Sequence, residues 1–395
     1  MGSRLEIARA FARGRWGRQA VNGYVPDCPI ETAQEFEDRF AERNALGLNL
    51  SDARAEAERE LAGGTSSYPG YSFGLSSGTM GRSGVFITHE HERDAWVGTV
   101  LGKFLPLRML LGADVALVLK HNSRLYTDVV KTRGVRLHYF NAAVPVEEWV
   151  AKLCALAPDV LVGPPSILEQ IAASARGSLR PALLLAGAEP LFPQDRAFLT
   201  EAYGVAPRVI YQAKEGFLAA ECSLGGVHLN EDIVRFEKLN LQGARFVPVI
   251  SDFRRTSQIY RRFRMDDVLV ASSDSCACGS PFARVDSVEG RANDVLLLGD
   301  RTVFPLEVNQ VMSKAGRDYR VSQVTGDRVS VACERGVPDD ALSALQLLIP
   351  GASISAEGYL RPVCGEKRRR VQRLFDPHND WLRHFTVSRN VASGL

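Results

Sequence analysis

The sequence predicts an α/β protein in which a large N-terminal domain of mixed sheets and helices precedes a small α+β C-terminal domain. Two observations carry this prediction. Between about residues 72 and 226, short apolar runs alternate with amphipathic segments, as in parallel strands joined by helical crossovers. After a turn at Gly299 and Asp300, the strand-like and helix-like segments are fewer, which indicates a second, smaller unit. A chain of 395 residues is long enough for both.

The individual elements can be placed from their periodicity. Residues 1–67 are polar and mostly helical, with helix-like spacing in the second half of the stretch 45–62. Strands are expected in the alternating region at 115–119, 137–140, 160–162, 183–186 and 209–211. Helices are expected between them at 147–156, 166–175 and 193–203. The segment 227–298 is rich in strands, and the last part of the chain contains strand-like runs at 319–324 and 328–333 and an amphipathic run at 339–348.

These segments suggest three parts: a domain over 1–298, a small domain over 299–376, and a loosely held tail over 377–395 with few apolar residues. The composition is that of an ordinary soluble protein, with 45% hydrophobic and 24% charged residues. A formal net charge of +2 argues against a nucleic-acid partner bound through a broad basic face.

Other classes of protein are disfavoured by what the chain does not contain. No apolar run approaches the roughly 20 residues that cross a bilayer, so no membrane partner is expected. The first residues lack the apolar core of a signal peptide. Seven cysteines, an odd number, do not suggest a disulfide framework. We therefore expect a cytoplasmic protein.

The most informative segment is the loop 74–84, which reads Gly–Leu–Ser–Ser–Gly–Thr–Met–Gly–Arg–Ser–Gly and holds four glycines and four hydroxyl residues. Glycine lets the backbone approach a ligand, and hydroxyl and N–H groups bind phosphate oxygens. The β-branched and aromatic run at 85–88 indicates a strand that would hold one end of the loop. On composition alone, a phosphate-binding loop and a flexible linker both remain open. A Walker loop is excluded because no Gly–Lys–Ser/Thr follows.

Four further motifs follow this loop. They read Gly–Ala–Glu–Pro–Leu at 187–191, Tyr–Gln–Ala–Lys–Glu–Gly at 211–216, Arg–Phe–Arg–Met–Asp–Asp at 262–267 and Glu–Gly–Arg–Ala–Asn–Asp at 289–294. In this order and spacing, the motifs resemble the adenylate-forming (acyl-CoA ligase-like) superfamily, in particular the phenylacetate–CoA ligase branch and its shorter relatives. The resemblance covers about residues 72–304. It implies the fold of that superfamily, with a mobile C-terminal domain beyond a hinge.

The resemblance also implies roles for individual residues in binding ATP. The β- and γ-phosphates would be held by Ser76, Ser77, Gly78 and Thr79. One wall of the adenine pocket would be formed by Gly187, Ala188, Glu189 and Pro190, with Tyr211 against the ring. Asp267, rather than its neighbour Asp266, would accept hydrogen bonds from both ribose hydroxyls, a role that suits a carboxylate. Arg291 would reach the ribose or a phosphate, unless it forms a surface salt bridge.

Two residues are candidates for the chemistry itself. Glu215 stands where the superfamily places a glutamate linked to Mg²⁺, a hard cation that prefers oxygen ligands; the alternative is a surface glutamate on a turn. Lys367 is the candidate for a lysine that swings into the site and meets the charge that develops on the α-phosphate. Its basic surroundings, Arg368 to Arg370, also fit a solvated face, and substitutions of those arginines are expected to matter much less.

A second group of residues suggests a structural metal site. Cys222 and His228 are six residues apart, and Cys276 and Cys278 follow about fifty residues later. Three thiolates and one imidazole suit a closed tetrahedral Zn²⁺ site, and some members of the phenylacetate–CoA ligase branch carry a structural metal of this kind. The alternative is a set of reduced, partly buried thiols. His89 and His91 have metal-like spacing but no evident third ligand, so we expect them at the surface where a helix begins.

The resemblance implies an enzyme that activates a small aromatic carboxylic acid as acyl-AMP and passes it to a thiol of CoA or of a carrier protein. Tyr139, Phe140 and the turn 163–165 are possible elements of the acid pocket, and a homodimer is compatible with this activity. Three alternatives stay open: transfer to an amine, activation of nitrite by an ATP-dependent diazotase, and a non-catalytic nucleotide-binding scaffold. The sequence does not distinguish among the acids or the acceptors.

Overall fold

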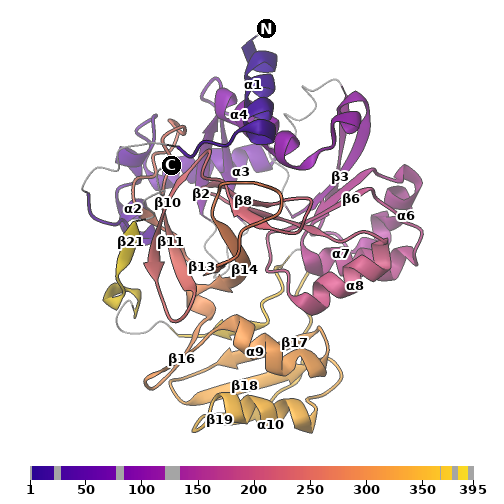
Figure 1. Ribbon diagram of the computed structural model, residues 1–395, viewed down its shortest axis with the longest axis vertical. Helices are drawn as coiled ribbons and strands as arrows, with labels where there is room; N and C mark the ends of the chain where they lie inside the picture. The colour runs from indigo at the N-terminus through magenta and orange to yellow at the C-terminus, as the bar shows by residue number, and fades with distance from the viewer. Residues whose placement is uncertain are drawn as a thin grey trace.

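A computed structural model of the protein describes residues 2–21, 28–76, 84–120, 134–364, 366–375 and 381–389. The chain forms a large unit and, at the lower end in Figure 1, a smaller unit. We call residues 296–373 the C-terminal unit, and the rest of the described chain the N-terminal unit. The large mixed sheet with helices on its faces confirms the predicted α/β class.

Among the described residues, thirteen strands form one sheet through the N-terminal unit. Five neighbouring strands of this sheet are parallel: β4 (Val135–Asn141), β3 (Ala113–Leu119), β5 (Val160–Gly163), β6 (Leu183–Gly187) and β7 (Arg208–Ala213). The connections contain α6 (Val146–Leu156), α7 (Pro165–Ala175) and α8 (Pro193–Tyr203). The expected strands and helices of this region are thus confirmed.

Local sequence explains where these helices begin and end. Helices α7 and α8 both start with a proline, whose fixed φ angle suits the first turn. Helix α8 ends at Gly204, which adopts a left-handed φ of 73°. The three helices pack on one face of the parallel strands around Leu161, Leu168 and Leu184, all fully buried. Because side chains alternate along a strand, the opposite face carries a different set of residues.

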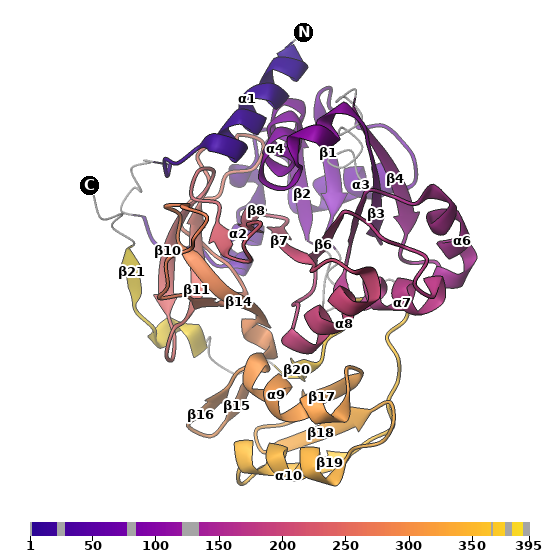
Figure 2. The same cartoon turned by 45° about the vertical axis from the view of Figure 1, so that its right-hand side comes forward.

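That opposite face is covered by α1 (Gly2–Trp16) and α4 (Glu90–Phe104), as Figure 2 shows. The two helices pack closely at Gly98, which has no side chain. A Cβ added there would lie 2.2 Å from the carbonyl oxygen of Ile7. His89 precedes the first turn of α4, where its backbone N–H donates to Glu92 Oε2 at 3.0 Å. His91 is exposed, which confirms that these histidines mark the start of a helix.

The other half of the sheet is antiparallel. Its strands are β8 (Gly216–Glu221), β9 (Val227–Leu229), β10 (Arg235–Asn240), β11 (Arg245–Ser251), β12 (Phe263–Arg264), β13 (Asp267–Ala271) and β14 (Arg284–Arg291). A hairpin of β1 (Tyr71–Leu75) and β2 (Val85–His89) packs against it with α2 (Ala33–Asp38), the 3₁₀ turn η1 (Phe40–Arg43) and α3 (Leu50–Leu61). The hairpin holds the two ends of the glycine-rich loop.

The C-terminal unit has a core of its own, centred on buried residues such as Val321, Val331 and Leu345. Its elements are the hairpin β15 (Leu296–Leu298) and β16 (Arg301–Val303), helices α9 (Pro305–Met312) and α10 (Asp339–Leu348), and the sheet of β17 (Tyr319–Gln323), β18 (Arg328–Cys333), β19 (Ser353–Ala356) and β20 (Val371–Arg373). Short 3₁₀ turns are η2 (Leu107–Leu111), η4 (Ala292–Asp294), η5 (Ser313–Ala315) and η6 (Trp381–His384).

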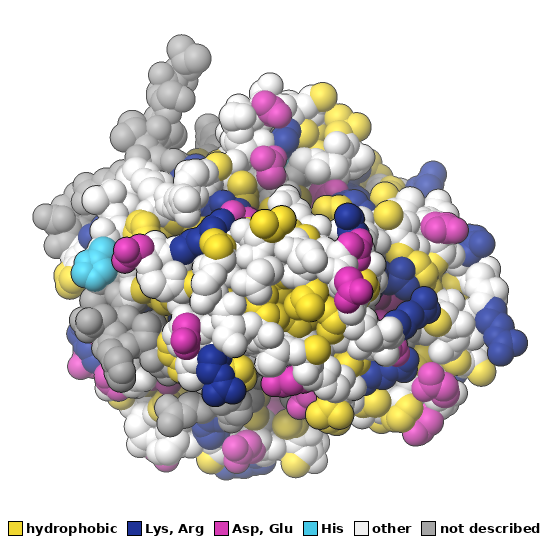
Figure 3. Space-filling model, turned by 90° about the horizontal axis from the view of Figure 1, so that it is seen from below, with side chains coloured by type: hydrophobic (Ala, Val, Ile, Leu, Met, Phe, Trp, Pro, Cys, Tyr) yellow, Lys and Arg dark blue, Asp and Glu magenta, His cyan; other side chains and the backbone are white. Residues whose placement is uncertain are grey.

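Seen from this end of the molecule, hydrophobic side chains and charges of both signs share the surface (Figure 3). The large apolar side chains that the C-terminal unit exposes include Leu347, Leu360 and Val363. Such a mixture is ordinary for a protein surface and has no single-sign charged face. Among the described residues, no helix combines the length and the apolar character needed to cross a membrane.

One expectation about the chain end is wrong. The stretch after residue 376 was expected to be loosely held, but β21 (Val387–Arg389) pairs antiparallel with β10 in the sheet of the N-terminal unit. Leu382 is buried beside Leu239 and Val247 in the adjoining core. A few apolar side chains and an open strand edge are therefore enough for this segment to pack on the N-terminal unit.

Candidate functional site

A cavity of about 1260 Å³ lies between the carboxyl ends of the parallel strands and the C-terminal unit. Ligands of open α/β sheets bind at this end of the strands. The cavity is lined by every predicted nucleotide and catalytic residue that the structure describes: Ser76, Gly187, Ala188, Glu189, Pro190, Tyr211, Glu215, Asp267, Arg291 and Lys367. Ser77, Gly78 and Thr79 lie outside the described residues. The roles assigned to these residues remain predictions.

The two described ends of the glycine-rich loop, Ser76 and Gly84, line the cavity. The backbone N–H of Ser76 donates to the carbonyl oxygen of Gly84 at 2.8 Å, and the N–H of Gly84 donates to Ser76 Oγ at 2.9 Å. A Cβ added at Gly84 would lie 2.7 Å from Lys214 Nζ, so the lysine ammonium stands against the base of the loop. Sequence reasoning missed Lys214, although it belongs to the motif that contains Glu215.

Three acidic residues line the cavity near Lys214: the buried Glu215 and the half-buried Asp266 and Asp267. The hydroxyl of Tyr211 donates to Asp267 Oδ2 at 2.6 Å, and burial together with this carboxylate raises the pKa of Tyr211 well above its ordinary value. Burial raises the pKa of Glu215, although Lys214 Nζ lies 3.8 Å from its Oε1 and partly offsets the effect. Burial and the neighbouring Asp267 raise the pKa of Asp266. Burial thus disfavours the charged forms of Glu215 and Asp266.

Lys367 reaches this cavity from the C-terminal unit. Burial lowers the pKa of its ammonium, and Arg291 adds to that effect, whereas Glu189 and Asp267 oppose it. These influences show that Lys367 stands among the residues predicted to bind the nucleotide.

Glu189 connects the predicted adenine wall to two other segments. Its carboxylate accepts hydrogen bonds from the N–H of Ser166 at 3.1 Å and from Ser166 Oγ at 2.8 Å. It also accepts the backbone N–H of Arg368 at 2.8 Å. Ala188, immediately before it, adopts a left-handed φ of 67°, which is uncommon for a residue with a Cβ. The turn thus directs Glu189 toward the segment that carries Lys367.

The basic run after Lys367 is not a solvated face, which corrects the alternative interpretation made from the sequence. Arg368 pairs with Glu169 and Arg370 pairs with Asp195, each through two hydrogen bonds. Both arginine side chains are at least nine-tenths buried. Burial opposes ionisation of Asp195, but hydrogen bonds from Arg370 lower its pKa. No local sequence pattern identified Glu169 or Asp195, because each pairs with an arginine far along the chain.

An apolar channel extends from the cavity under α4 and along the sheet. It is lined by aliphatic side chains of β3, β4, β5, β6 and β7 together with Trp96, Val100 and Phe104 of α4. Tyr139 lines it and donates its hydroxyl to the carbonyl oxygen of Leu119 at 2.7 Å. Phe140 does not line it: its side chain lies on the other face of the sheet against Trp149, with ring centroids 5.3 Å apart. The suggestion that Phe140 belongs to the acid pocket is therefore wrong.

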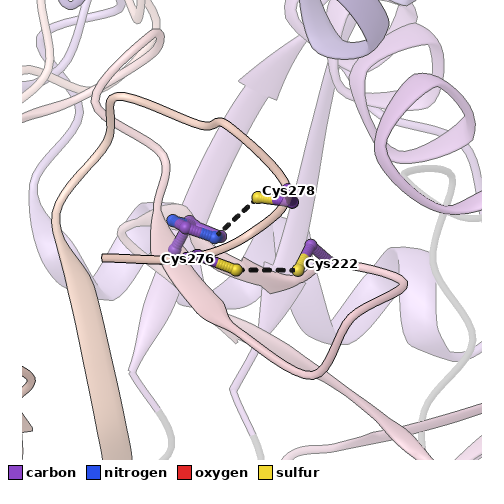
Figure 4. Close-up of side chains that lie close together, drawn as sticks. Cys222, Cys276 and Cys278 are labelled. Atoms are coloured by element: carbon purple, nitrogen blue, oxygen red, sulfur yellow. Dashed lines mark hydrogen bonds between the residues drawn. The ribbon is translucent and has the colours of Figure 1, made fainter. Parts of the chain in front are cut away.

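The predicted zinc ligands come together away from the cavity. The ligand atoms of Cys222, His228, Cys276 and Cys278 all lie within 4.8 Å of one another, and Figure 4 shows the three thiols facing a common centre. Cys222 follows β8, His228 lies in β9, and the other two lie in the turn between β13 and β14. The structure thus joins segments that are about fifty residues apart in sequence.

Distances in this cluster fit a tetrahedral metal site. The sulfur atoms of Cys222 and Cys276 are 3.7 Å apart, close to the roughly 3.8 Å expected for two sulfurs on one Zn²⁺ and far longer than a disulfide bond. Cys278 Sγ lies 3.3 Å from His228 Nε2. His228 Nδ1 lies 3.1 Å from the carbonyl oxygen of Phe282, which orients the ring with Nε2 toward the thiols. The two distances between ligand atoms, and the 4.8 Å limit on the others, fit four ligands around one zinc ion.

Known proteins similar to this chain were found only among solved structures. A scan of protein-family models and a search of curated proteins found no match. A search of solved structures matched 2-hydroxyisobutyryl-CoA ligase in the postadenylation state with an acyl-AMP, with a TM-score of 0.66 and 17% identity over 95% of this chain and 88% of that chain. The chain has the fold of the adenylate-forming ligases. This confirms the fold that the five motifs implied.

Other solved structures with this fold score lower. An anthranilate CoA ligase in complex with anthranoyl-AMP gives a TM-score of 0.55 at 13% identity, over 75% of this chain and 64% of that chain. The amide bond synthetase McbA from Marinactinospora thermotolerans gives 0.56 at 16% identity, over 74% and 66%. These proteins have different named acceptors, so the shared fold does not by itself identify the acceptor used here.

The 2-hydroxyisobutyryl-CoA ligase has been solved in several arrangements. The TM-score is 0.66 with the postadenylation state, 0.56 with an open conformation and 0.53 with the thioesterification state. The share of this chain that is matched stays at 94–95%. The chain shares the fold of this ligase in all three arrangements.

Proposed function

We propose that this protein is an ATP- and Mg²⁺-dependent ligase that activates a carboxylic acid as its acyl-AMP. The observation that carries the proposal is the convergence of Glu215, Asp267 and Lys367 on one cavity from three distant segments. The fold supports the same conclusion. In the reaction, a carboxylate oxygen of the acid attacks the α-phosphorus of ATP, the bond to the bridging oxygen breaks, and pyrophosphate leaves.

Each residue has a role that its surroundings support. Asp267 would accept hydrogen bonds from the ribose hydroxyls, with its position held by the Tyr211 hydroxyl. Lys367 would place its positive charge at the α-phosphate, where negative charge develops. Ser76, together with the loop that follows it, would bind the β- and γ-phosphates. Arg291 would bind the ribose or a phosphate.

The fit of Mg²⁺ follows from the chemistry of the donors. Glu215 is buried, its pKa is raised by that burial, and a second carboxylate, Asp266, is in a similar state. A divalent cation would supply the positive charge that these oxygens lack, and it would also screen the phosphates of ATP. Glu215 is the carboxylate that we assign to it.

The lining of the channel supports an acid with an apolar group. Its walls are aliphatic strand residues, with the rings of Trp96, Phe104 and Tyr139 at its sides. Such a lining would bury the carbon skeleton of a small aromatic acid, the substrate class that we propose. The acyl group would then pass to a thiol of CoA or of a carrier protein, which completes the proposed reaction.

One experiment tests the proposal directly. Acid-dependent exchange of labelled pyrophosphate into ATP is measured with a panel of aromatic and aliphatic acids, and nitrite with an arylamine is included in separate assays. Exchange that depends on an aromatic acid supports the proposal in full. Exchange with aliphatic acids only would change the proposed substrate class from aromatic to aliphatic acids. Product formation with nitrite would make nitrite, and not a carboxylic acid, the substrate. No turnover with any of them would contradict the proposed adenylation activity.

The zinc cluster has a separate, structural role in this proposal. All four protein ligands would be used, so no coordination position remains for a substrate. The ion would tie the turn after β8 to the loop between β13 and β14. It would thereby stabilise the antiparallel half of the sheet, which carries Asp267 and Arg291.

A further inference from the structure

Two buried ion pairs join the two units directly after Lys367. We propose that Asp195 and Glu169 form a latch that positions Lys367 in the cavity by holding Arg370 and Arg368. Lys367 would be the catalytic residue, and the two carboxylates would be positioning residues that act through it. The inference rests on the proposed function, because it concerns the step in which Lys367 takes part.

The first half of the latch is the pair Arg370 and Asp195. Arg370 Nη1 and Nη2 donate to the two carboxylate oxygens of Asp195, both at 2.6 Å. The side chain of Asp195 is 0% exposed and that of Arg370 is 3% exposed. Arg370 Nε also donates to the carbonyl oxygen of Arg317 at 2.6 Å, within the C-terminal unit. The guanidinium is thus bound to both units and fixes their orientation at this point.

The second half of the latch is adjacent to Lys367 itself. Arg368 Nη1 and Nη2 donate to the carboxylate oxygens of Glu169, both at 2.9 Å, and Nη2 also lies 3.3 Å from Asp195. The backbone N–H of Arg368 donates to Glu189 Oε1 at 2.8 Å. Because both the side chain and the backbone of Arg368 are held, the preceding residue is confined to the edge of the cavity.

Asp195 has further contacts at the start of α8. Asp195 lies in the first turn of α8, where it also accepts the N–H of Phe192 at 3.4 Å. The residue before it, Gln194, exchanges two side-chain hydrogen bonds with Asn309 of the C-terminal unit, at 2.6 and 3.1 Å. The start of α8 therefore contacts the C-terminal unit through two neighbouring residues.

The chemistry of the latch suits a contact that must also open. A buried ion pair adds little net stability, because both charges lose their hydration when it forms. The same pair strongly disfavours misaligned arrangements, in which a buried charge would lack its partner. When the units separate, both charges return to water. An ionic latch can therefore specify one orientation of Lys367 without holding the units together permanently.

The first test measures docking and does not require the acid to be known. Hydrogen–deuterium exchange is followed by mass spectrometry in the wild type, in Asp195→Asn and in the control Asp340→Asn. Asp340 forms an exposed ion pair with Lys314 at 3.6 Å inside the C-terminal unit. We expect faster exchange in peptides covering 366–373 for Asp195→Asn only. Exchange in β18, in the core of the C-terminal unit, should not change, which shows that the unit remains folded.

The second test asks whether the latch acts through Lys367. With an acid that the wild type activates, Asp195→Asn should lower kcat for pyrophosphate release by roughly tenfold or more. The Kd of Mg·ATP, whose other proposed contacts lie in the N-terminal unit, should change little. The double variant Asp195→Asn/Lys367→Ala should be no slower than Lys367→Ala, because the latch has no further effect once the lysine is gone.

The outcomes separate this inference from the proposed function. Wild-type exchange at 366–373 in Asp195→Asn, or fully additive losses in the double variant, would overturn the latch. If no acid is activated by the wild type while exchange at 366–373 still rises, the proposed activity fails and the docking role of Asp195 stands. If Asp195→Asn does not fold, Glu169→Gln takes its place with the same criteria, since it leaves the pair of Arg370 and Asp195 intact.

Discussion

The docking interface and the cavity both contain buried carboxylates, yet the charges in the two places are balanced differently. Asp195 is matched by Arg370 and Arg368, and its pKa is lowered. Glu215 is equally enclosed, but its closest cation among the described residues is Lys214 at 3.8 Å, and its pKa is raised. The first carboxylate is neutralised within the protein. The second has no cation as close among the described residues, and burial dominates its pKa.

The largest effects should follow from the cavity carboxylates. Glu215→Gln and Asp267→Ala should each lower adenylation by about two to four orders of magnitude, because each removes a group that holds charge or ribose in the reactive arrangement. The melting temperature of Glu215→Gln should not fall, since the neutral amide avoids the cost of burying a charge. Pyrophosphate release and thermal unfolding measure the two quantities. Near-wild-type release by both variants would remove the adenylation hypothesis.

Replacing the lysine between the two regions should have the next largest effect. Lys367→Ala should slow acyl-AMP formation by roughly a hundredfold, as expected when one group that stabilises developing charge is lost. Transfer from preformed acyl-AMP should be largely spared, because no comparable charge then builds up on phosphorus. Normal adenylation by this variant would show that another basic residue takes the role.

The pH dependence of the wild type offers an independent check on Lys367. Because burial lowers the pKa of this lysine, its ammonium loses its proton at a lower pH than the ordinary 10.5. The rate of adenylation should therefore decline on the alkaline side at a pH below 10.5, as the positive charge is lost. The same alkaline decline should be absent from the residual rate of Lys367→Ala, and its persistence there would assign it to a different group.

Substitutions of the arginine in the latch should have a smaller effect. Arg370→Ala should lower kcat for adenylation by roughly tenfold and Arg370→Lys by less, since lysine keeps the charge but cannot donate to both oxygens of Asp195. The sequence alone had suggested that these arginines matter much less than Lys367. Steady-state kinetics on these two variants and Lys367→Ala orders the three effects, and equal rates for Arg370→Ala and the wild type would show that Arg370 has no part in adenylation.

The smallest effect on chemistry should come from the metal cluster, which lies apart from both regions. The purified protein should contain about one zinc ion per chain. Cys276→Ser should release it and lower the melting temperature by several degrees, while the folded fraction keeps its adenylation rate. Cys364→Ser, which changes an exposed thiol, is the matched control. Protein that is prepared with zinc but contains none would leave only the reduced-thiol interpretation.

Much of the fold was predictable because it depends on local patterns. The helix α10 has the bounds that its amphipathic spacing predicts, and the expected parallel strands agree with the observed ones to within two residues at either end. The grouping of the four candidate metal ligands was also expected, from the resemblance to the phenylacetate–CoA ligase branch together with their residue types, and the structure brings them together. The nucleotide residues were identified by the order of five motifs, each of them a short continuous segment.

What the sequence could not predict depends on packing between distant segments. Periodicity did not show that Phe140 faces α6 rather than the channel, because both faces of this strand are covered. A short apolar segment did not reveal that β21 would find the edge of β10. The basic run 367–370 looked like a solvated face because nothing local indicated its partners.

The sequence by itself therefore determined most elements of this protein, and through the order of its motifs it suggested the residues of the candidate site and the four candidate metal ligands. The elements rest on spacing within short stretches of chain. Only the tertiary structure decided which charges are neutralised inside the protein. Arg368 meets Glu169 across 199 residues and Arg370 meets Asp195 across 175, and the cost of burying an ion depends on what lies beside it in space.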